Sequence, residues 1–250
     1  MHARAQLRKT VRWLMLAIVG LSVAACNTTI HIPPATGTPA FDAANASLIA
    51  REAVLVPRDL PGDRWVETPL DEFDESAPNI PTRACQELAR KRDLQRQRGE
   101  ATLAARAQSL LEAPGPTFGG SVETSVRIYR DVQTPADVLA YIRDEVESGV
   151  YPACFRDALA ASLPATPDAR VAIRTAELTR PAPTEDGIAR AYQVTVMAAN
   201  RQAELRLELY SWRMSNAGVT VVIFGDLSVI DAAVTNAAIS TIAGTLQPGR

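Results

Sequence analysis

The side chains that could carry out chemistry in this sequence are few. Nucleophilic catalysis by Ser or Cys usually needs a neighbouring base, most often His. Beyond residue 25 the only histidine is His31, in a stretch rich in Thr, Pro and Ala, and the only lysine is Lys91, with no Ser-x-x-Lys motif before it. The sequence also has no Gly-x-Ser-x-Gly motif, phosphate-cradling glycine loop or His/Cys metal cluster. We therefore expect that the protein is not an enzyme and that it binds neither a cofactor nor a metal.

Carboxylates are the remaining reactive groups. Asp71, Glu72, Asp74 and Glu75 form an acidic stretch, but their spacing matches no EF-hand loop and lacks its glycine. We interpret this stretch as a solvated loop. Paired carboxylates of the glycosidase kind remain an alternative, because pairing in space is invisible in a sequence. A carboxylate-based hydrolase is the least favoured of our functional hypotheses.

Cys26 is the residue with the clearest predicted chemistry. Residues 1–12 contain four basic residues and no acid, and residues 13–25 are uncharged, as in an export signal. Thirteen uncharged residues are too few for a membrane-spanning helix, which needs roughly 20. The segment ends in Val23-Ala24-Ala25-Cys26, which resembles the lipobox of bacterial lipoproteins. We predict a signal peptide over 1–25 and lipidation of Cys26; an ordinary secretory signal is the alternative.

Lipidation would fix where the rest of the chain resides. Several acyl chains on one residue give firm membrane anchoring, where one gives marginal binding. Residues 26–45, rich in Thr, Pro and Ala, then read as a disordered tether. We expect residues 46–250 to form one monomeric domain, held at the extracytoplasmic face of the membrane by lipidated Cys26.

Two further cysteines, Cys85 and Cys154, remain after Cys26. An even pair in an oxidising compartment is most simply a disulfide. The alternative is two unpaired buried thiols.

The overall charge argues against nucleic acid as a partner, since the net charge is −2. Basic residues do gather in one predicted helix, residues 83–100, but acids are interleaved with them. We favour a solvated helix face there over a basic arm that rests on anionic headgroups.

The elements that must position any site are clearest in the last third of the chain. Residues 171–178, 188–199, 203–213 and 218–225 read as strands joined by short turns, and 121–130 alternates as a half-buried strand. Helices are expected at 46–56, 134–148, 154–163 and 229–243, the last opened by a capping box of Ser228 and Asp231. Consecutive strands with short turns require an antiparallel sheet, so we predict an α+β fold: a central antiparallel sheet flanked by helices, with the amphipathic terminal helix packed on it.

One strand offers a candidate binding face. Arg206, Tyr210 and Trp212 alternate with leucines in the predicted strand 203–213, so they share one side of it. This side is either an exposed binding surface or is covered by the N-terminal helix.

The order of elements resembles that of actinobacterial sensor-type lipoproteins, similar to the extracellular sensor domains of mycobacterial serine/threonine kinases and more loosely to the Mog1/PsbP-like fold. The resemblance rests on Leu60-Pro61-Gly62-Asp63-Arg64-Trp65 after a helix, on Cys85 and Cys154 around a strand and a helix, and on the final strand and helix. It implies a non-catalytic domain that binds a ligand or protein, without a cofactor. Our first hypothesis is thus a binding or sensory module for a protein or cell-envelope component, and the second is a carrier of an apolar or lipidic ligand.

Overall fold

The computed structural model describes residues 37–69, 82–163, 170–176, 178, 180–198 and 201–247. The predicted signal peptide, Cys26 and the acidic stretch at 71–75 lie outside these residues. None of the described helices has the length and apolar character needed to cross a bilayer.

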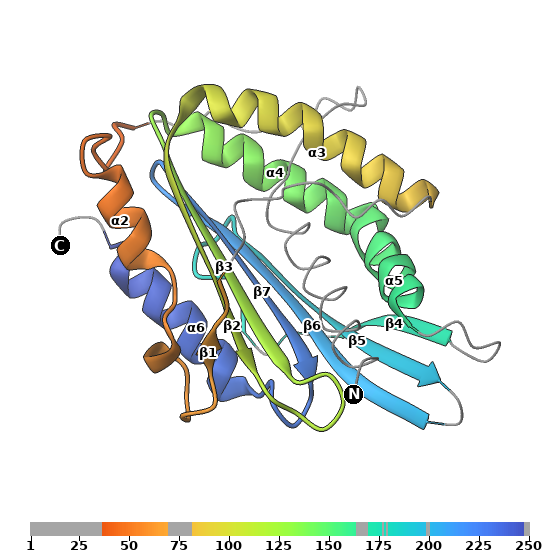
Figure 1. Cartoon of the computed structure of the whole chain (residues 1–250). Helices are drawn as coiled ribbons and strands as arrows, with labels where there is room; N and C mark the ends of the chain where they lie inside the picture. The colour runs from red at the N-terminus through yellow and green to blue at the C-terminus, as the bar shows by residue number, and fades with distance from the viewer. Residues whose placement is uncertain are drawn as a thin grey trace.

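A seven-stranded antiparallel sheet organises the domain (Figure 1), and its order is β1-β2-β3-β7-β6-β5-β4. The strands are β1 (Val66–Glu67), β2 (Leu103–Ala113), β3 (Gly120–Tyr129), β4 (Arg170–Ala176), β5 (Ile188–Ala198), β6 (Arg201–Met214) and β7 (Ala217–Asp226). β3 and β7 lie at the centre, and β4 forms one edge.

Helices cover both faces of this sheet (Figure 1). They are α2 (Ala46–Ala53), the 3-10 turn η1 (Pro57–Asp59), α3 (Arg83–Thr102), α4 (Gln133–Glu147), α5 (Val150–Ser162) and α6 (Ala232–Thr245). α2 and α6 pack on one face in a core that contains Tyr210 and Trp212. α4 and α5 pack on the other face, over the leucines of β6. The predicted α+β architecture, with the terminal helix on the sheet, is confirmed.

Two local predictions differ from the structure, and one strand has no counterpart among the predictions. Residues 103–113, where the sequence has a mixed pattern, form the long strand β2, which pairs with β3. β3 is buried on both faces rather than half-buried. α6 is capped by Asp231, whose carboxylate accepts a hydrogen bond from Val234 N–H. Asp231 is therefore the N-cap itself and not the N3 residue of a box that begins at Ser228.

Ordered contacts begin before the predicted tether ends. Phe41 is buried, and its backbone N–H donates to Oδ1 of Asn216 in the β6–β7 turn, with Asn216 Nδ2 donating back to the Phe41 carbonyl. Ala40 N–H donates to Ser215 Oγ. The folded domain therefore extends to about residue 40, earlier than the predicted boundary at 46.

Candidate functional site

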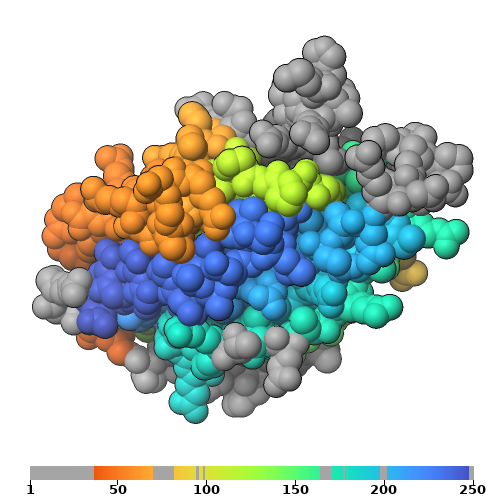
Figure 2. Space-filling view, turned by 90° about the horizontal axis from the view of Figure 1, so that it is seen from below, coloured from red at the N-terminus to blue at the C-terminus, as the bar shows by residue number. Residues whose placement is uncertain are grey.

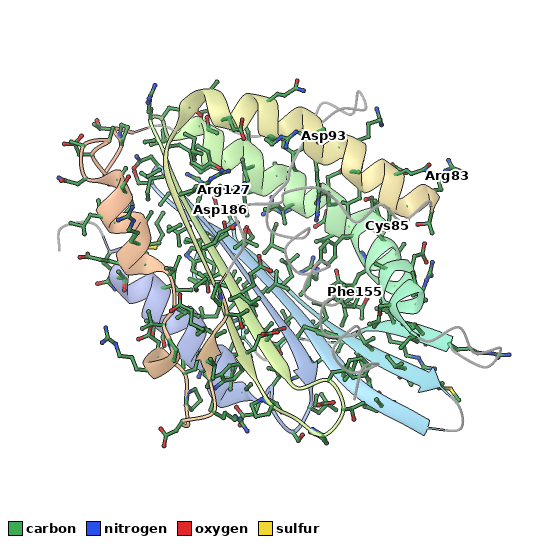
Figure 3. The ribbon with its side chains drawn as sticks, in the orientation of Figure 1. Arg83, Cys85, Asp93, Arg127, Phe155 and Asp186 are labelled. Atoms are coloured by element: carbon green, nitrogen blue, oxygen red, sulfur yellow. A yellow bond between two sulfur atoms is a disulfide. The ribbon has the colours of Figure 1, made fainter. Side chains whose placement is uncertain are left out.

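The disulfide Cys85–Cys154 is present, as predicted. It joins the start of α3 to α5, and both sulfurs lie in a small apolar cluster with Leu88. Figure 3 shows Cys85 where α3 approaches α5, and Phe155 between α5 and the sheet, where its ring lies 5.5 Å from that of Phe224. The disulfide thus fixes α3 to the layer of helices that covers the leucines of β6.

A cluster of ionisable side chains is buried between this helical layer and the sheet. Arg92 of α3 is 2% exposed, and its Nε lies 3.7 Å from Oε2 of Glu145 on α4. Glu123 of β3 and Tyr151 of α5 belong to the same region, since the charge of Arg92 acts on both. Both carboxylate oxygens of Glu123 and the hydroxyl of Tyr151 are buried without a hydrogen-bond partner among the described residues. The buried guanidinium of Arg92 therefore lies where side chains from α3, α4, α5 and β3 come together.

Burial decides the protonation of these carboxyl groups. Desolvation raises the pKa of Glu123 well above its usual value, and the opposing effect of Arg92 is smaller. Desolvation also raises the pKa of Glu145 to about 7, against the charges of Arg92 and Lys91. Burial therefore favours the neutral form of Glu123, and the carboxyl group of Glu145 titrates near neutrality.

The same cluster borders a small, partly open cavity. This cavity is about 30 Å³ and is lined by Arg92, Glu145, Tyr151 and neighbouring side chains of β3, β6 and β7. A water molecule needs only about 10–15 Å³ on this measure, whereas a pocket for a small organic ligand spans roughly 300–1,000 Å³. The cavity is large enough for water and too small for an acyl chain.

Glu145 should make the free energy of unfolding fall as the pH rises. Its pKa is about 7 when folded, against 4.5 for the ordinary group, so the folded protein binds the extra proton between these values. The stabilisation is complete below about pH 4.5 and is lost as the pH rises through 7. Relative to Glu145→Gln, we expect the free energy of unfolding of the wild type to fall by about 1–3 kcal/mol between pH 5 and 8.

Urea unfolding at several pH values, with the disulfide intact, measures this effect. The readout is the slope of the free energy of unfolding against pH, compared between the wild type and Glu145→Gln. Subtracting the two slopes removes the contribution of the other carboxyl groups, which both proteins share. Glu52→Gln, an exposed position on α2, is the matched control and should keep the wild-type slope. Equal slopes in Glu145→Gln and wild type would mean that Glu145 stays ionised in the folded protein.

The candidate binding face on β6 is largely covered, which is the second of the two alternatives that its alternating pattern left open. Tyr210 is 2% exposed and Trp212 is 1% exposed, and both belong to the core under α2 and α6. The side chain of Arg206 is partly exposed, and its Nη1 lies 3.3 Å from Oε1 of the buried Glu208.

Glu208 explains the role of these residues. Its Oε2 accepts hydrogen bonds from the Tyr210 hydroxyl at 3.3 Å and from Thr235 Oγ1 of α6 at 2.7 Å. Arg206 balances its charge. Arg206 and Tyr210 therefore help a buried carboxylate to hold α6 on the sheet, which is a structural role.

An open cleft lies along the connection from β4 to β5, at the edge of the sheet that β4 forms. Its volume is about 820 Å³. In Figure 2 this connection, drawn in teal, projects beside α6, and the light-blue strands of the β5–β6 hairpin reach the surface next to it. The lining residues are Thr175, Ala176, Leu178, Arg180, Pro181, Ala182, Pro183, Thr184, Glu185, Gly187, Ala189 and Arg190.

The loop that lines the cleft is tied to neighbouring elements, and its lining is mixed. Its loop is held to the rest of the sheet by Asp186, whose Oδ2 lies 2.6 Å from Arg213 Nε on β6, and by its backbone carbonyl, which accepts from Arg143 of α4. Arg180 is exposed, while Leu178 and Ala189 present apolar surface that packs toward the α6 core. Such a site can take a ligand that combines apolar contact with negative charge.

Metal binding has no support among the described residues, where no group of three or more His, Cys, Asp or Glu side chains could hold an ion. The acidic stretch at 71–75 lies outside the described residues.

These features define an α+β domain with one sheet between two helical layers. In overall shape it is similar to the extracellular domain of PknH from Mycobacterium tuberculosis, at 12% sequence identity and a TM-score of 0.45, over 84% of this chain and 98% of that one. No known protein family matches the chain. No curated protein matches it either.

Proposed function

We propose that this chain is a lipid-anchored extracytoplasmic domain that binds a protein or cell-envelope component and catalyses no reaction. The observation that favours this proposal is the open cleft of about 820 Å³ along the connection from β4 to β5. It is large enough for a segment of a partner, and its fixed loop provides a formed surface.

Two features support the location. The lipobox pattern that ends at Cys26 favours covalent attachment to the membrane. The disulfide Cys85–Cys154 is typical of a protein that folds in an oxidising compartment.

Other features favour binding over catalysis. A catalytic group must reach its substrate, and the side chains of the cluster around Arg92, which has strongly shifted pKa values, are buried between the helices and the sheet. The cavity beside that cluster, at about 30 Å³, is too small to support a carrier that encloses a lipid.

The anchor is tested by Cys26→Ser. In a bacterial host supplied with radiolabelled palmitate, the wild type should incorporate label and fractionate with membranes, because the cysteine thiol is the acylated group. The variant should incorporate none. Labelled palmitate on the variant would contradict lipidation at Cys26.

Binding at the cleft is tested by photo-crosslinking. A photoreactive residue is placed at Thr184, in the cleft, and as a matched control at Glu52, exposed on α2. On whole cells, position 184 should give a discrete adduct that excess unlabelled protein competes away, and position 52 should not. The absence of a competed adduct at 184 would overturn the cleft as a binding site. Stoichiometric lipid extracted from the purified protein would favour the carrier instead.

A further inference from the structure

The edge strand β4 borders the cleft and has an outer side of its own. Among the described strands it pairs with β5 alone, through all seven residues from Arg170↔Met197 to Ala176↔Ala191. A strand at the edge of a sheet presents backbone N–H and C=O groups to which another strand can add. The opposite edge, β1, is only two residues long, so β4 is the longer template.

The two faces of β4 differ in chemistry. Val171 and Ile173 point to the face under α5, where they pack against the core of β5 and β6 side chains. Arg170 and Arg174 point to the other face, and both are exposed. Alternate side chains along one strand are therefore apolar on one face and basic on the other.

The cleft continues this surface. Thr175 and Ala176, the last residues of β4, are also part of its lining. The exposed Arg180 follows a few residues further along the chain and lies in the same cleft. An extended chain that runs along β4 would thus enter the cleft at its end, next to a third arginine.

We propose that β4 binds an extended acidic segment of a partner protein as an additional strand of the sheet. This inference rests on the proposed binding function and names its surface and ligand class. The partner segment carries acidic side chains opposite Arg170 and Arg174, hence four residues apart, and apolar side chains at the positions between them that face α5. Residues opposite one another in a sheet have Cβ atoms about 4.5–5.5 Å apart, close enough for ion pairs.

Charge selects this occupant over a second copy of the chain. If two β4 strands paired with each other, the arginines of both would share one face, and like charges opposite one another destabilise a sheet. Arginines on an edge strand also discourage self-association in this way. The carboxylates of an acidic segment would instead form ion pairs with Arg170 and Arg174.

The binding test uses the lipidated full chain in neutral detergent and a fluorescent peptide, Thr-Glu-Val-Thr-Val-Glu-Thr with blocked ends. The matched control peptide has Gln in place of both Glu residues. Anisotropy should show that the Glu peptide binds at least tenfold more tightly, because only it can pair with both arginines. N-methylation of alternate peptide amides should abolish binding for one set of positions and spare the other, since only one set faces β4.

Charge reversal locates the site. In the double variant Arg170→Glu with Arg174→Glu, the Glu peptide should lose at least tenfold in affinity and a Lys version of it should gain. Arg51→Glu with Arg58→Glu, both exposed positions near α2, makes the same change in net charge and should leave binding unchanged. Hydrogen exchange should show added protection of β4 amides when the Glu peptide is bound.

Three results would overturn the inference: equal affinity for the Glu and Gln peptides, equal loss in both double variants, or tolerance of N-methylation at every position. Binding to phosphatidylglycerol vesicles that is lost with Arg170→Glu and Arg174→Glu, in the absence of peptide binding, would assign the arginines to a lipid surface and also overturn it. The crosslink at Thr184 separates the two proposals. An adduct there without peptide binding rejects strand addition and keeps the cleft as a binding site.

Discussion

A chain that ends at Leu227 should fail to form a soluble folded domain. The deletion removes α6, whose Val234, Ala238 and Ile242 are completely buried, along with Val229 and Ile230. Each large apolar side chain that is fully buried contributes about 1.5–3 kcal/mol, and a domain has only 5–15 kcal/mol in total. Losing several such side chains removes most or all of the net stability.

The loss also exposes what α6 covers. Val219, Val221 and Ile223 of β7 would lie on an open apolar face beside Trp212, and an exposed patch of this kind promotes aggregation. The buried carboxylate of Glu208 would lose its hydrogen bond from Thr235.

Expression followed by gel filtration and hydrogen exchange measures the result. A chain that ends at Gln247, and so keeps α6, is the matched control and should behave as the full chain. A soluble monomeric product of the Leu227 truncation, with protected amides in β7, would show that the sheet does not need α6.

The second large effect concerns the disulfide. Replacement of both Cys85 and Cys154 by Ala should lower the free energy of unfolding by about 4 kcal/mol, because the link closes a long loop in the unfolded chain. The two residues are 69 positions apart. Both positions are buried in the folded protein, so alanine, which is smaller and apolar, introduces no unpaired polar group.

Urea unfolding compares the oxidised wild type, the reduced wild type and the double alanine variant. The reduced wild type should approach the variant, since both lack the link. Hydrogen exchange should show that the loss of protection is larger in α3 than in α6, because the disulfide holds α3 to α5 and α6 lies on the other face of the sheet. Equal stability of all three forms would mean that packing alone holds α3 in place.

The sequence by itself determined the elements whose signal is local. The leucines of β6 alternate with polar residues, β7 is an apolar run that only Thr220 interrupts, and α6 has an apolar stripe at helical spacing. The two strands formed within two residues of the predicted ranges, and α6 begins three residues later than predicted. The number of cysteines was enough to predict the disulfide, because only Cys85 and Cys154 remain after Cys26. The antiparallel α+β class followed from the short turns between these strands.

Tertiary structure decided the elements and sites whose signal is not local. β2 is rich in Ala and Leu, which favour helices, and it is a strand because β3 pairs with it. Glu123 and Arg92 lie on faces that the sequence marks as polar, and the stacking of α3, α4 and α5 on the sheet buries them. The polar pattern alone cannot distinguish an exposed polar face from a buried ion pair.

The same limit applies to the candidate binding surfaces. The alternation in β6 correctly placed Arg206, Tyr210 and Trp212 on one face, but only the packing of α2 and α6 decided that this face is interior. The cleft beside β4 had no signal in the sequence, since loop residues form it and the position of the loop depends on contacts such as Asp186 with Arg213. Periodicity specifies which side chains share a face, whereas the packing of distant segments specifies whether that face meets protein or solvent.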